Sequence, residues 1–395
     1  MIPFYRPSVS SEESMAIAKV IESGNLTHGE TVRDFEAEIE RKVGCGKCIA
    51  LDSCTAALEM SLRALGVGEG DEVITTPFTY SATAEVIRNV GAKIVFADIE
   101  KDSFFIDTQE ILKKINNRTK AVIPVDYGGV MFDYEQLKRQ ISNTKFVAKN
   151  EFQEKIGRIA IIADAAHSFG AMLNGVKSGC AADFNCFSFH AVKPITTGGE
   201  GGAVCFDSMD EELADRISLI ADHGQTKRNK ENGWEYDIKL FGFNSIMTNI
   251  DAAFGLCQLK NFDKTQKKRE RVARMYNDMF EEDGVTALNH FDKGMLSAYH
   301  LYPLKIRKYS DDERNAEFRN KLYAFMLENG ICCNVHYKPL PMMTAYKNEG
   351  FYIKDYPNAY SRFSETLTIP FHSELEFEQM AYIAAIIKRG LKCVK

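Results

Sequence analysis

Seven short apolar runs of the kind that favours β-strands recur in the first half of the sequence. They lie at residues 48–51, 72–75, 93–97, 121–125, 158–163, 185–189 and 202–206. Helical patterns, for example at residues 55–65 and 109–115, separate most of the first five runs. Strands that alternate with helices form parallel or mixed sheets with helices on both faces, so the sequence predicts an α/β fold. We expect one large domain with a seven-stranded mixed sheet flanked by helices.

The second half of the chain has a different pattern. A polar, basic stretch at residues 225–237 precedes a long helical pattern that continues to about Phe280. Beyond it, strand patterns at residues 301–306 and 332–336 mix with helical patterns at 315–329 and 376–388. We therefore expect a large domain over residues 1–250, including an N-terminal arm that ends at a capping box of Ser10 and Glu13. Residues 251–395 should form a linking helix and a smaller α+β domain.

Charge and composition argue against several classes of protein. The net charge is −6, and no basic block stands out, so we expect no nucleic-acid partner. No apolar stretch approaches the roughly 18 residues of a membrane span, and the start lacks a secretory signal. Ten cysteines without a disulfide framework fit a reducing cytoplasm. Cys45 and Cys48 form one C-x-x-C without a second pair, so we expect buried thiols and no metal site.

One lysine, Lys193, lies in the apolar and glycine-rich stretch of residues 183–204. Burial disfavours the ammonium form, so a lysine in such a place loses proton affinity. A neutral amine can form a Schiff base with a carbonyl group, which is how pyridoxal 5'-phosphate (PLP) is anchored. Ser188, five residues earlier, could reach a phosphate. A strand, a loop and a solvated lysine remain the alternative.

A second stretch, residues 52–57, follows a predicted strand and opens a predicted helix. The free backbone amides of Cys54, Thr55 and Ala56 at such a helix start could hold a phosphate. An ordinary helix cap by Ser53 or Thr55 is the alternative. The glycine-containing loop at residues 25–30, which includes Thr27, could face a ligand or simply turn.

Two further strand-to-helix junctions carry side chains suited to a flat cofactor. Asp164 follows the strand pattern at 158–163, and ligands of α/β sheets lie beyond the carboxyl ends of strands. Its carboxylate could pair with a protonated pyridine nitrogen, and His167 could donate to a ring oxygen. Tyr80 could stack on the ring. Asp164 as a helix cap and Tyr80 as a core residue are the alternatives.

Taken together, these stretches resemble the DegT/StrS family of PLP-dependent aminotransferases, mostly nucleotide-sugar aminotransferases of fold type I. The resemblance covers nearly the whole chain. It rests on LTHGETVRDFE, DSCTAAL, ALGVGEGDEVITTPFTYSATA, ADAAHSFGA, FSFHAVKPITTGGEGGAV, GFNSIMTNIDAAFGLCQL, VHYKPL and PNAYSRFSETLTIP. It implies that Lys193 is the Schiff-base lysine, that Asp164 pairs with the pyridine nitrogen, and that both act in catalysis. His167 would lie near the ring hydroxyl, and Tyr80 would stack on the ring.

The same resemblance implies the remaining contacts. Ser188 and the amides of Cys54, Thr55 and Ala56 would hold the phosphate of the cofactor. Asn244 would reach that phosphate from the neighbouring subunit of a homodimer, so that the active sites are shared. His336 and Lys338, in a basic and aromatic loop, and Thr27 are the substrate contacts that we expect.

Three departures from the family pattern stand out. Cys54 replaces a glycine of the usual S-G-T-A-A motif, which a phosphate held by amides should tolerate. Ile246 stands where a basic residue is usual, which weakens any inference about a nearby anionic substrate. The turn TTGGEGG after Lys193 is one residue longer than a common form.

The resemblance implies transfer of an amino group, with glutamate as the expected donor, to a keto sugar on a nucleotide diphosphate. A regulatory or sensing protein on the same scaffold is one alternative, although the intact lysine, aspartate and serine weigh against it. Another PLP reaction, such as aminobenzoate formation, is a second.

Overall fold

A seven-stranded mixed sheet forms the centre of the computed structural model, which describes residues 1–206, 211–227, 232–281 and 285–394. Its strands, in spatial order, are β1 (Lys47–Leu51), β9 (Gly202–Phe206), β8 (Phe184–Ser188), β5 (Ala160–Asp164), β4 (Thr119–Ile123), β2 (Glu72–Thr75) and β3 (Lys93–Phe96). Strand β9 runs antiparallel to both of its neighbours, and the remaining pairs are parallel. The predicted sheet is confirmed.

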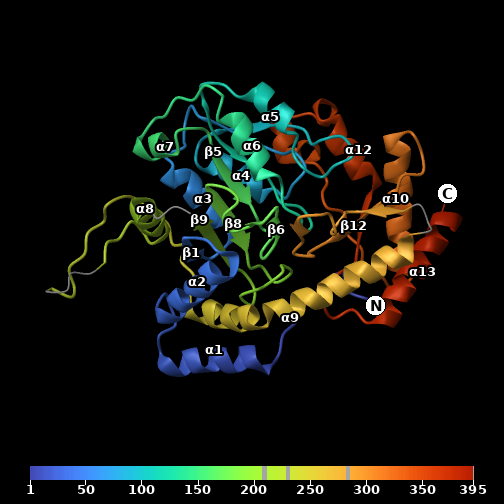
Figure 1. Ribbon diagram of the computed structural model, residues 1–395, viewed down its shortest axis with the longest axis horizontal. Coiled ribbons are helices and arrows are strands. Elements are labelled where there is room, and N and C mark those ends of the chain that lie inside the picture. Colours follow the sequence, from blue (N-terminus) through green and yellow to red (C-terminus); the bar gives the residue numbers. More distant parts are fainter. Residues whose placement is uncertain (207–210, 228–231, 282–284, 395) are drawn as a thin grey trace.

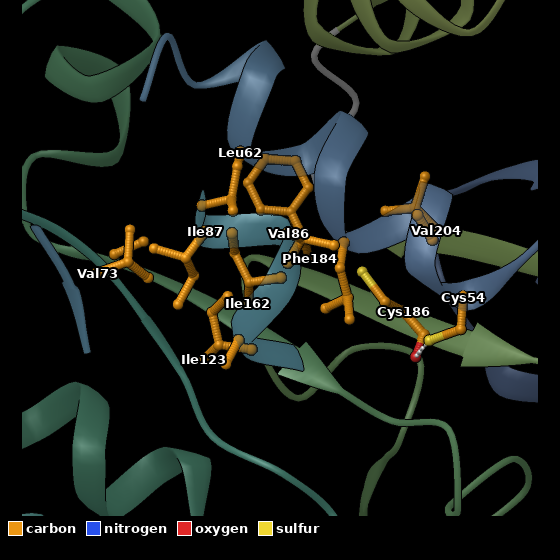
Figure 2. Packing of buried hydrophobic residues seen from close by; sticks show 14 of the residues in the cluster. Cys54, Leu62, Val73, Val86, Ile87, Ile123, Ile162, Phe184, Cys186 and Val204 are labelled. Atoms are coloured by element: carbon orange, nitrogen blue, oxygen red, sulfur yellow. Dashed lines mark hydrogen bonds between the residues drawn. The ribbon is translucent and has the colours of Figure 1, made fainter. Parts of the chain in front are cut away.

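Alternate residues of each strand face opposite sides of this sheet, as the pleat requires. On one side, Val73, Ile123 and Ile162 pack against α3 (Cys54–Ala64), α4 (Ala82–Asn89) and α8 (Glu211–Ala221). Figure 2 shows Leu62 of α3 and Ile87 of α4 over these strands. The opposite side is covered by α2 (Glu30–Val43), α6 (Tyr134–Ile141) and the first half of α9 (Asn249–Phe280). The sheet is therefore buried on both faces.

The long helix α9 leads from the large sheet to the C-terminal elements, with α1 (Ser11–Ser23) packed along it (Figure 1). The predicted capping box of Ser10 and Glu13 opens α1, and Gly24 ends it in the left-handed conformation. At the other end, a three-stranded sheet of β10 (Thr286–Ala287), β12 (Tyr302–Lys305) and β13 (Thr366–Ile369) packs with α10 (Asp312–Glu328) and α13 (Phe377–Cys393) around a third core cluster. A domain boundary near residue 250 stays a prediction.

Shorter elements complete the chain. They are α5 (Thr108–Lys114), α7 (Glu151–Ile156), β6 (Met172–Leu173), β7 (Val176–Lys177), β11 (Met295–Leu296), α11 (Thr344–Asn348), α12 (Pro357–Glu365) and the 3-10 turns Leu340–Met342 and Ile353–Asp355. Within the described ranges, no helix combines the length and the apolar character that crossing a bilayer requires.

One predicted strand, at residues 332–336, is wrong. Its β pairing is limited to two isolated bridges: Ile331, just before the segment, pairs with Ile2, and Asn334 pairs with Thr368. The Asn334 side chain accepts a hydrogen bond from the Val335 amide at 2.8 Å, and such local bonds compete with a strand ladder. The chain then turns, which brings His336 to a cavity described below.

Two glutamates protect the edge of the large sheet at β1. The Cys48 amide donates to Glu40 at 2.9 Å, and the Ala50 amide donates to Glu36 at 2.9 Å. Both carboxylates lie on α2, one turn apart, so they satisfy backbone donors that an edge strand otherwise leaves open. Burial raises the pKa of Glu36 to about 7, although the Ala50 amide and the charge of Lys47 oppose the shift.

We predict that Glu36→Gln stabilises the protein at neutral pH. The folded-state pKa lies above the unfolded value, so the folded state binds more protons between the two values, and stability falls as pH rises from about 4.5 to about 7. Glutamine keeps an acceptor for the Ala50 amide without the charge. Urea unfolding at about pH 8 should therefore show a gain of roughly 1–3 kcal/mol.

Glu40→Gln is the matched control, because Glu40 caps the same strand one turn along the helix and also pairs with Lys47 at 3.6 Å. This variant should not gain stability. Equal pH dependence of unfolding in the wild type and in Glu36→Gln, measured from about pH 5 to about pH 8, would contradict the prediction.

Candidate active site

A cavity of about 410 Å³ opens beyond the carboxyl ends of β5 and β8 and next to the N-termini of α3 and α4. Such a location is where ligands of open α/β sheets bind. The cavity is lined by eight of the side chains predicted from the sequence: Cys54, Thr55, Tyr80, Asp164, His167, Ser188, Lys193 and His336. The structure thus brings together residues from five separate stretches of the chain.

The start of α3 forms one wall of the cavity. Ser53 caps the helix, accepting a hydrogen bond from the Ala56 amide at 3.1 Å. The amide of Ala56, predicted to bind phosphate, is therefore already engaged, and Ala56 does not line the cavity. The amides of Cys54 and Thr55, the first two helical residues, have no acceptor within the helix and remain suited to an anion.

Strand β9 comes so close to this helix start that only glycine fits at position 202. A Cβ atom on Gly202 would lie 2.4 Å from the Cys54 nitrogen. The Cys54 thiol, which replaces the usual glycine, donates to the Cys186 carbonyl at 3.3 Å and packs among the core residues of this face (Figure 2). Cysteine at this position therefore leaves the backbone amides of the helix start in place.

Asp164 ends β5 and is almost fully buried. Burial raises the pKa of Asp164; the Thr83 hydroxyl, which donates to it at 2.7 Å, the Ala166 amide and the charge of Lys193 oppose this rise. Thr83 is a residue that the sequence analysis missed. It lies one helical turn beyond Thr79, whose hydroxyl is 2.9 Å away, in the stretch noted only for Tyr80.

Lys193 lies in the turn between β8 and β9, where its amide donates to the His190 carbonyl at 2.9 Å. Burial lowers the pKa of the Lys193 amine, and the charges of Asp164 and Glu200 partly counter that effect. A larger share of this amine is therefore neutral near pH 7 than in a solvated lysine. Ser188, at the end of β8, lines the same cavity.

Both ring nitrogens of His167 are already engaged. Its Nδ1 atom accepts from the Gly128 amide at 3.2 Å, and its Nε2 atom lies 3.0 Å from the Tyr337 hydroxyl. Burial lowers the pKa of His167 well below its usual range, so the ring is neutral with its proton on Nε2. His167 Nε2–H therefore donates to the Tyr337 oxygen. The proton of the Tyr337 hydroxyl is not used in this bond, so it can be donated to a ligand in the cavity. Sequence reasoning missed Tyr337, although it lies in the VHYKPL stretch.

Two more histidines surround the lysine without adding charge. The ring centroid of His300 lies 4.5 Å from that of His167, and burial lowers the pKa of His300 well below its usual range. Burial also lowers the pKa of His336 to about 3. His336 can thus offer hydrogen bonds to a ligand, but not a positive charge at neutral pH.

A second buried carboxyl group, Asp126, also lines the cavity and was not predicted. It accepts hydrogen bonds from the Ser168 hydroxyl at 2.5 Å, the Tyr134 hydroxyl at 2.8 Å and the Phe132 amide at 2.8 Å. Burial raises its pKa to about 7. Asp126 thereby fixes the turn that carries His167.

Three predicted residues, Thr27, Asn244 and Lys338, are exposed and lie outside the cavity lining of this single chain. The backbone around Asn244 is well anchored: Phe243 donates to Ile220, and the Ser245 amide donates to Ala221. Ile246, at the usually basic position, pairs with Leu51 and packs against the core of the large sheet. An apolar residue therefore suits its surroundings.

Comparisons with known proteins agree on one family. The family model described as DegT/DnrJ/EryC1/StrS aminotransferase family matches residues 7–388. The chain is 35% identical to the spore coat polysaccharide biosynthesis protein SpsC of Bacillus subtilis, covering 99% of this chain and 97% of the relative. It is 32% identical to a UDP-4-amino-4,6-dideoxy-N-acetyl-beta-L-altrosamine transaminase of Campylobacter jejuni, covering 100% and 99%. The structure of Spr1654 from Streptococcus pneumoniae in its PLP form has a TM-score of 0.94 at 36% identity, over 99% and 98% of the chains.

We predict that Lys193 titrates below the ~10.4 of a solvated lysine, because burial disfavours its charged form. Competitive labelling of the protein with acetic anhydride across a pH series, read out by peptide mass, gives the pKa of each reactive amine. In Asp164→Asn the pKa of Lys193 should fall further, because the lost carboxylate favours the ammonium form. A wild-type Lys193 that titrates like a solvated lysine would contradict this.

Proposed function

Because the chain belongs to the DegT/DnrJ/EryC1/StrS aminotransferase family, we propose that it moves an amino group from glutamate to a keto sugar on a nucleotide diphosphate. The relatives named as transaminases of UDP-linked amino sugars support this class of acceptor. The observation that carries the proposal is the single cavity that Lys193 and Asp164 line together with the α3 helix start. A regulatory protein has no need of this combination.

The residues of the cavity suit PLP. A helix start with free amides and the Ser188 hydroxyl are donors for a phosphate dianion. A buried carboxylate with two donors of its own, Asp164, suits a protonated ring nitrogen. Tyr80 lines the cavity with an exposed ring, available for stacking on a flat group. PLP and PMP forms of a structural relative support the same cofactor, and the enzyme is PLP-dependent.

When bound, PLP supplies an aldehyde that takes up the amino group and a ring that withdraws electrons. The chain supplies the rest. Lys193 Nζ, whose pKa burial lowers, would take a proton from the α carbon of the donor and later return one to the acceptor carbon. The Asp164 carboxylate would hold the proton on the ring nitrogen. The Tyr337 hydroxyl, which accepts from His167, offers an O–H donor at the cavity wall. His336 would contact the acceptor as a neutral group, and contacts from Thr27 and Lys338 stay predictions.

A homodimer is the assembly that we propose, with Asn244 completing the partner's phosphate site. Three exposed side chains in the segment that precedes Asn244 support an interface: Phe241 is 99% exposed, Trp234 is 75% exposed, and Tyr236 is 50% exposed. Apolar groups gathered in this way mark association surfaces. They belong to a segment after α8 that projects away from the body of the molecule (Figure 1). None of the ten cysteines, all within the described residues, forms a disulfide, which supports a cytoplasmic location.

The function is tested in two half-reactions. We expect glutamate to bleach the visible absorbance of the PLP-loaded enzyme, and a keto sugar nucleotide from a panel to restore it. Lys193→Ala should do neither, yet should retain pyridoxamine phosphate, because its phosphate donors are unchanged. Borohydride reduction should add the cofactor mass to the Lys193 peptide. Addition to another lysine, or absorbance that glutamate leaves unchanged, would refute the proposal.

The shared site predicts recovery of activity when two defective subunits are mixed. Lys193→Ala removes the amine, and Asn244→Ala is expected to weaken cofactor retention. A hybrid dimer then carries both defects in one site and neither in the other. Co-expression should recover up to roughly a quarter of wild-type activity, because half of randomly paired dimers are hybrids with one intact site.

The alternative is that Asn244 serves the phosphate site of its own subunit. It has a structural basis, because the Ser245 carbonyl accepts from the Asp52 amide beside the subunit's own α3. If Asn244 served its own subunit, every site in the mixture would carry one lesion, and no activity would return. Asn329→Ala is the control, because Asn329 ends α10, remote from the cavity lining, so that variant should be active alone.

A further inference from the structure

The N-terminal arm crosses from the C-terminal elements to the turn that carries Lys193. Its first residues pair with the segment after α10: the Ile2 amide donates to the Gly330 carbonyl at 2.7 Å, and the Cys332 amide donates back to Ile2 at 3.0 Å. The Phe4 ring then lies 5.5 Å from the ring of His336. Figure 1 shows the N-terminus beside the C-terminal end of α9. We call residues 2–5 the N-terminal strap.

Tyr5, the last residue of the strap, contacts the backbone of the lysine itself. Its hydroxyl donates to the Lys193 carbonyl oxygen at 2.9 Å. The same hydroxyl oxygen accepts from Arg269 of α9 at 3.2 Å, while the other Arg269 nitrogen donates to the Pro194 carbonyl at 2.6 Å. One tyrosine and one arginine thus hold two successive carbonyl groups, at Lys193 and at Pro194.

The burial of Arg269 shows that this contact is costly to maintain. Arg269 is 4% exposed, and within the described parts of the chain its guanidinium forms no ion pair. A buried charge that is bonded only to neutral oxygens loses its solvation energy. It lacks the Coulomb attraction of a carboxylate that would offset this loss. The guanidinium nevertheless lies at the lysine turn, where its donors are directed at two oxygens.

Lys193 and Pro194 have few backbone restraints within the turn itself. Lys193 and Pro194 lie outside the strands β8 and β9, and proline has no amide hydrogen to donate. The Lys193 amide bonds to His190 three residues earlier, a contact within the same turn. The bonds from Tyr5 and Arg269 are therefore what ties the carbonyl side of this turn to distant elements. A lysine with four side-chain torsions can place Nζ reproducibly only from a fixed backbone.

We propose that the N-terminal strap and Arg269 position Lys193, with the Tyr5 hydroxyl as the contact that fixes its backbone. Tyr5 and Arg269 are positioning residues: they touch the lysine's backbone and act through its Nζ atom. This inference rests on the proposed function, because it concerns the amine that bonds to PLP. Lys193 Nζ would bond the aldehyde carbon of PLP with release of one water, whereas pyridoxamine phosphate would bind without using Nζ.

That difference provides a readout independent of turnover. In Tyr5→Phe we expect the affinity for PLP to fall roughly threefold to tenfold, the range that one lost hydrogen bond gives, while the affinity for pyridoxamine phosphate stays unchanged. Both are measured by titration of the full-length apo-protein, followed by absorbance for PLP and by fluorescence for pyridoxamine phosphate. The measured quantity is the ratio of the affinity for PLP to the affinity for pyridoxamine phosphate. Arg269→Gln should lower this affinity ratio at least as much as Tyr5→Phe does.

Two matched controls separate positioning from general stability. The Tyr276 hydroxyl donates to the Pro370 carbonyl at 2.9 Å, the distance of the bond from Tyr5 to Lys193. Tyr276 lies on α9, as Arg269 does, but its bond is away from the lysine turn. Arg319 is buried like Arg269 and donates to the carbonyl groups of Phe363 and Thr366. Tyr276→Phe and Arg319→Gln should leave the affinity ratio unchanged even where they lower the melting temperature.

The proposal is overturned if Tyr5→Phe leaves the ratio within twofold of wild type, if it weakens both ligands equally, or if a control lowers the ratio as much. A Tyr5→Phe chain that fails to fold counts against positioning unless Arg269→Gln lowers the ratio. If the wild type bound neither PLP nor pyridoxamine phosphate, the proposed function itself would fail, and that outcome is distinct from any change in the ratio.

Discussion

The burial of the Asp164 carboxylate is the constraint around which the site is built. A carboxylate without water is stable only when donors replace the solvent, and here the Thr83 hydroxyl, the Ala166 amide and the field of Lys193 do so. The positions of these groups follow from the sheet: β5 ends at Asp164 beside β8, which leads two residues past Cys186 to Ser188. The parallel order of the strands thus brings the acid, the hydroxyl and the amine to one edge.

Most of the fold could be predicted from the spacing of apolar residues and from the residues that end helices and strands. The bounds of β2 and β9 agree with the apolar runs because each strand is buried on both faces and is bounded by polar or glycine residues. The residues that reasoning from the sequence missed share one property: their contacts join distant segments. Thr83 meets Asp164 across 81 residues, and Tyr337 meets His167 across 170. No local sequence pattern marks such pairs. The strand predicted at residues 332–336 is wrong for a local reason, because the Asn334 side chain accepts from the next backbone amide.

The environment of Lys193 is polar but carries little charge. His167, His300 and His336 all have pKa values lowered by burial, so none is protonated at neutral pH. Three imidazoliums would repel an ammonium group and attract stray anions. As neutral rings they supply hydrogen bonds and shape. The charge in this part of the cavity is then set by the acidic groups that line it, Asp164, Asp126 and Glu200, and by the state of the lysine itself.

The carboxylates of α2 also limit how copies of this chain can meet. Glu36 and Glu40 occupy the backbone donors of Cys48 and Ala50, which β1 would otherwise offer to a strand of another molecule. An incoming strand would have to displace both side chains before it gained a hydrogen bond. The large sheet therefore cannot simply continue from one molecule into the next at β1. At this edge of the sheet, a contact between copies would have to be made by side chains, whose sequence can tune the choice of partner.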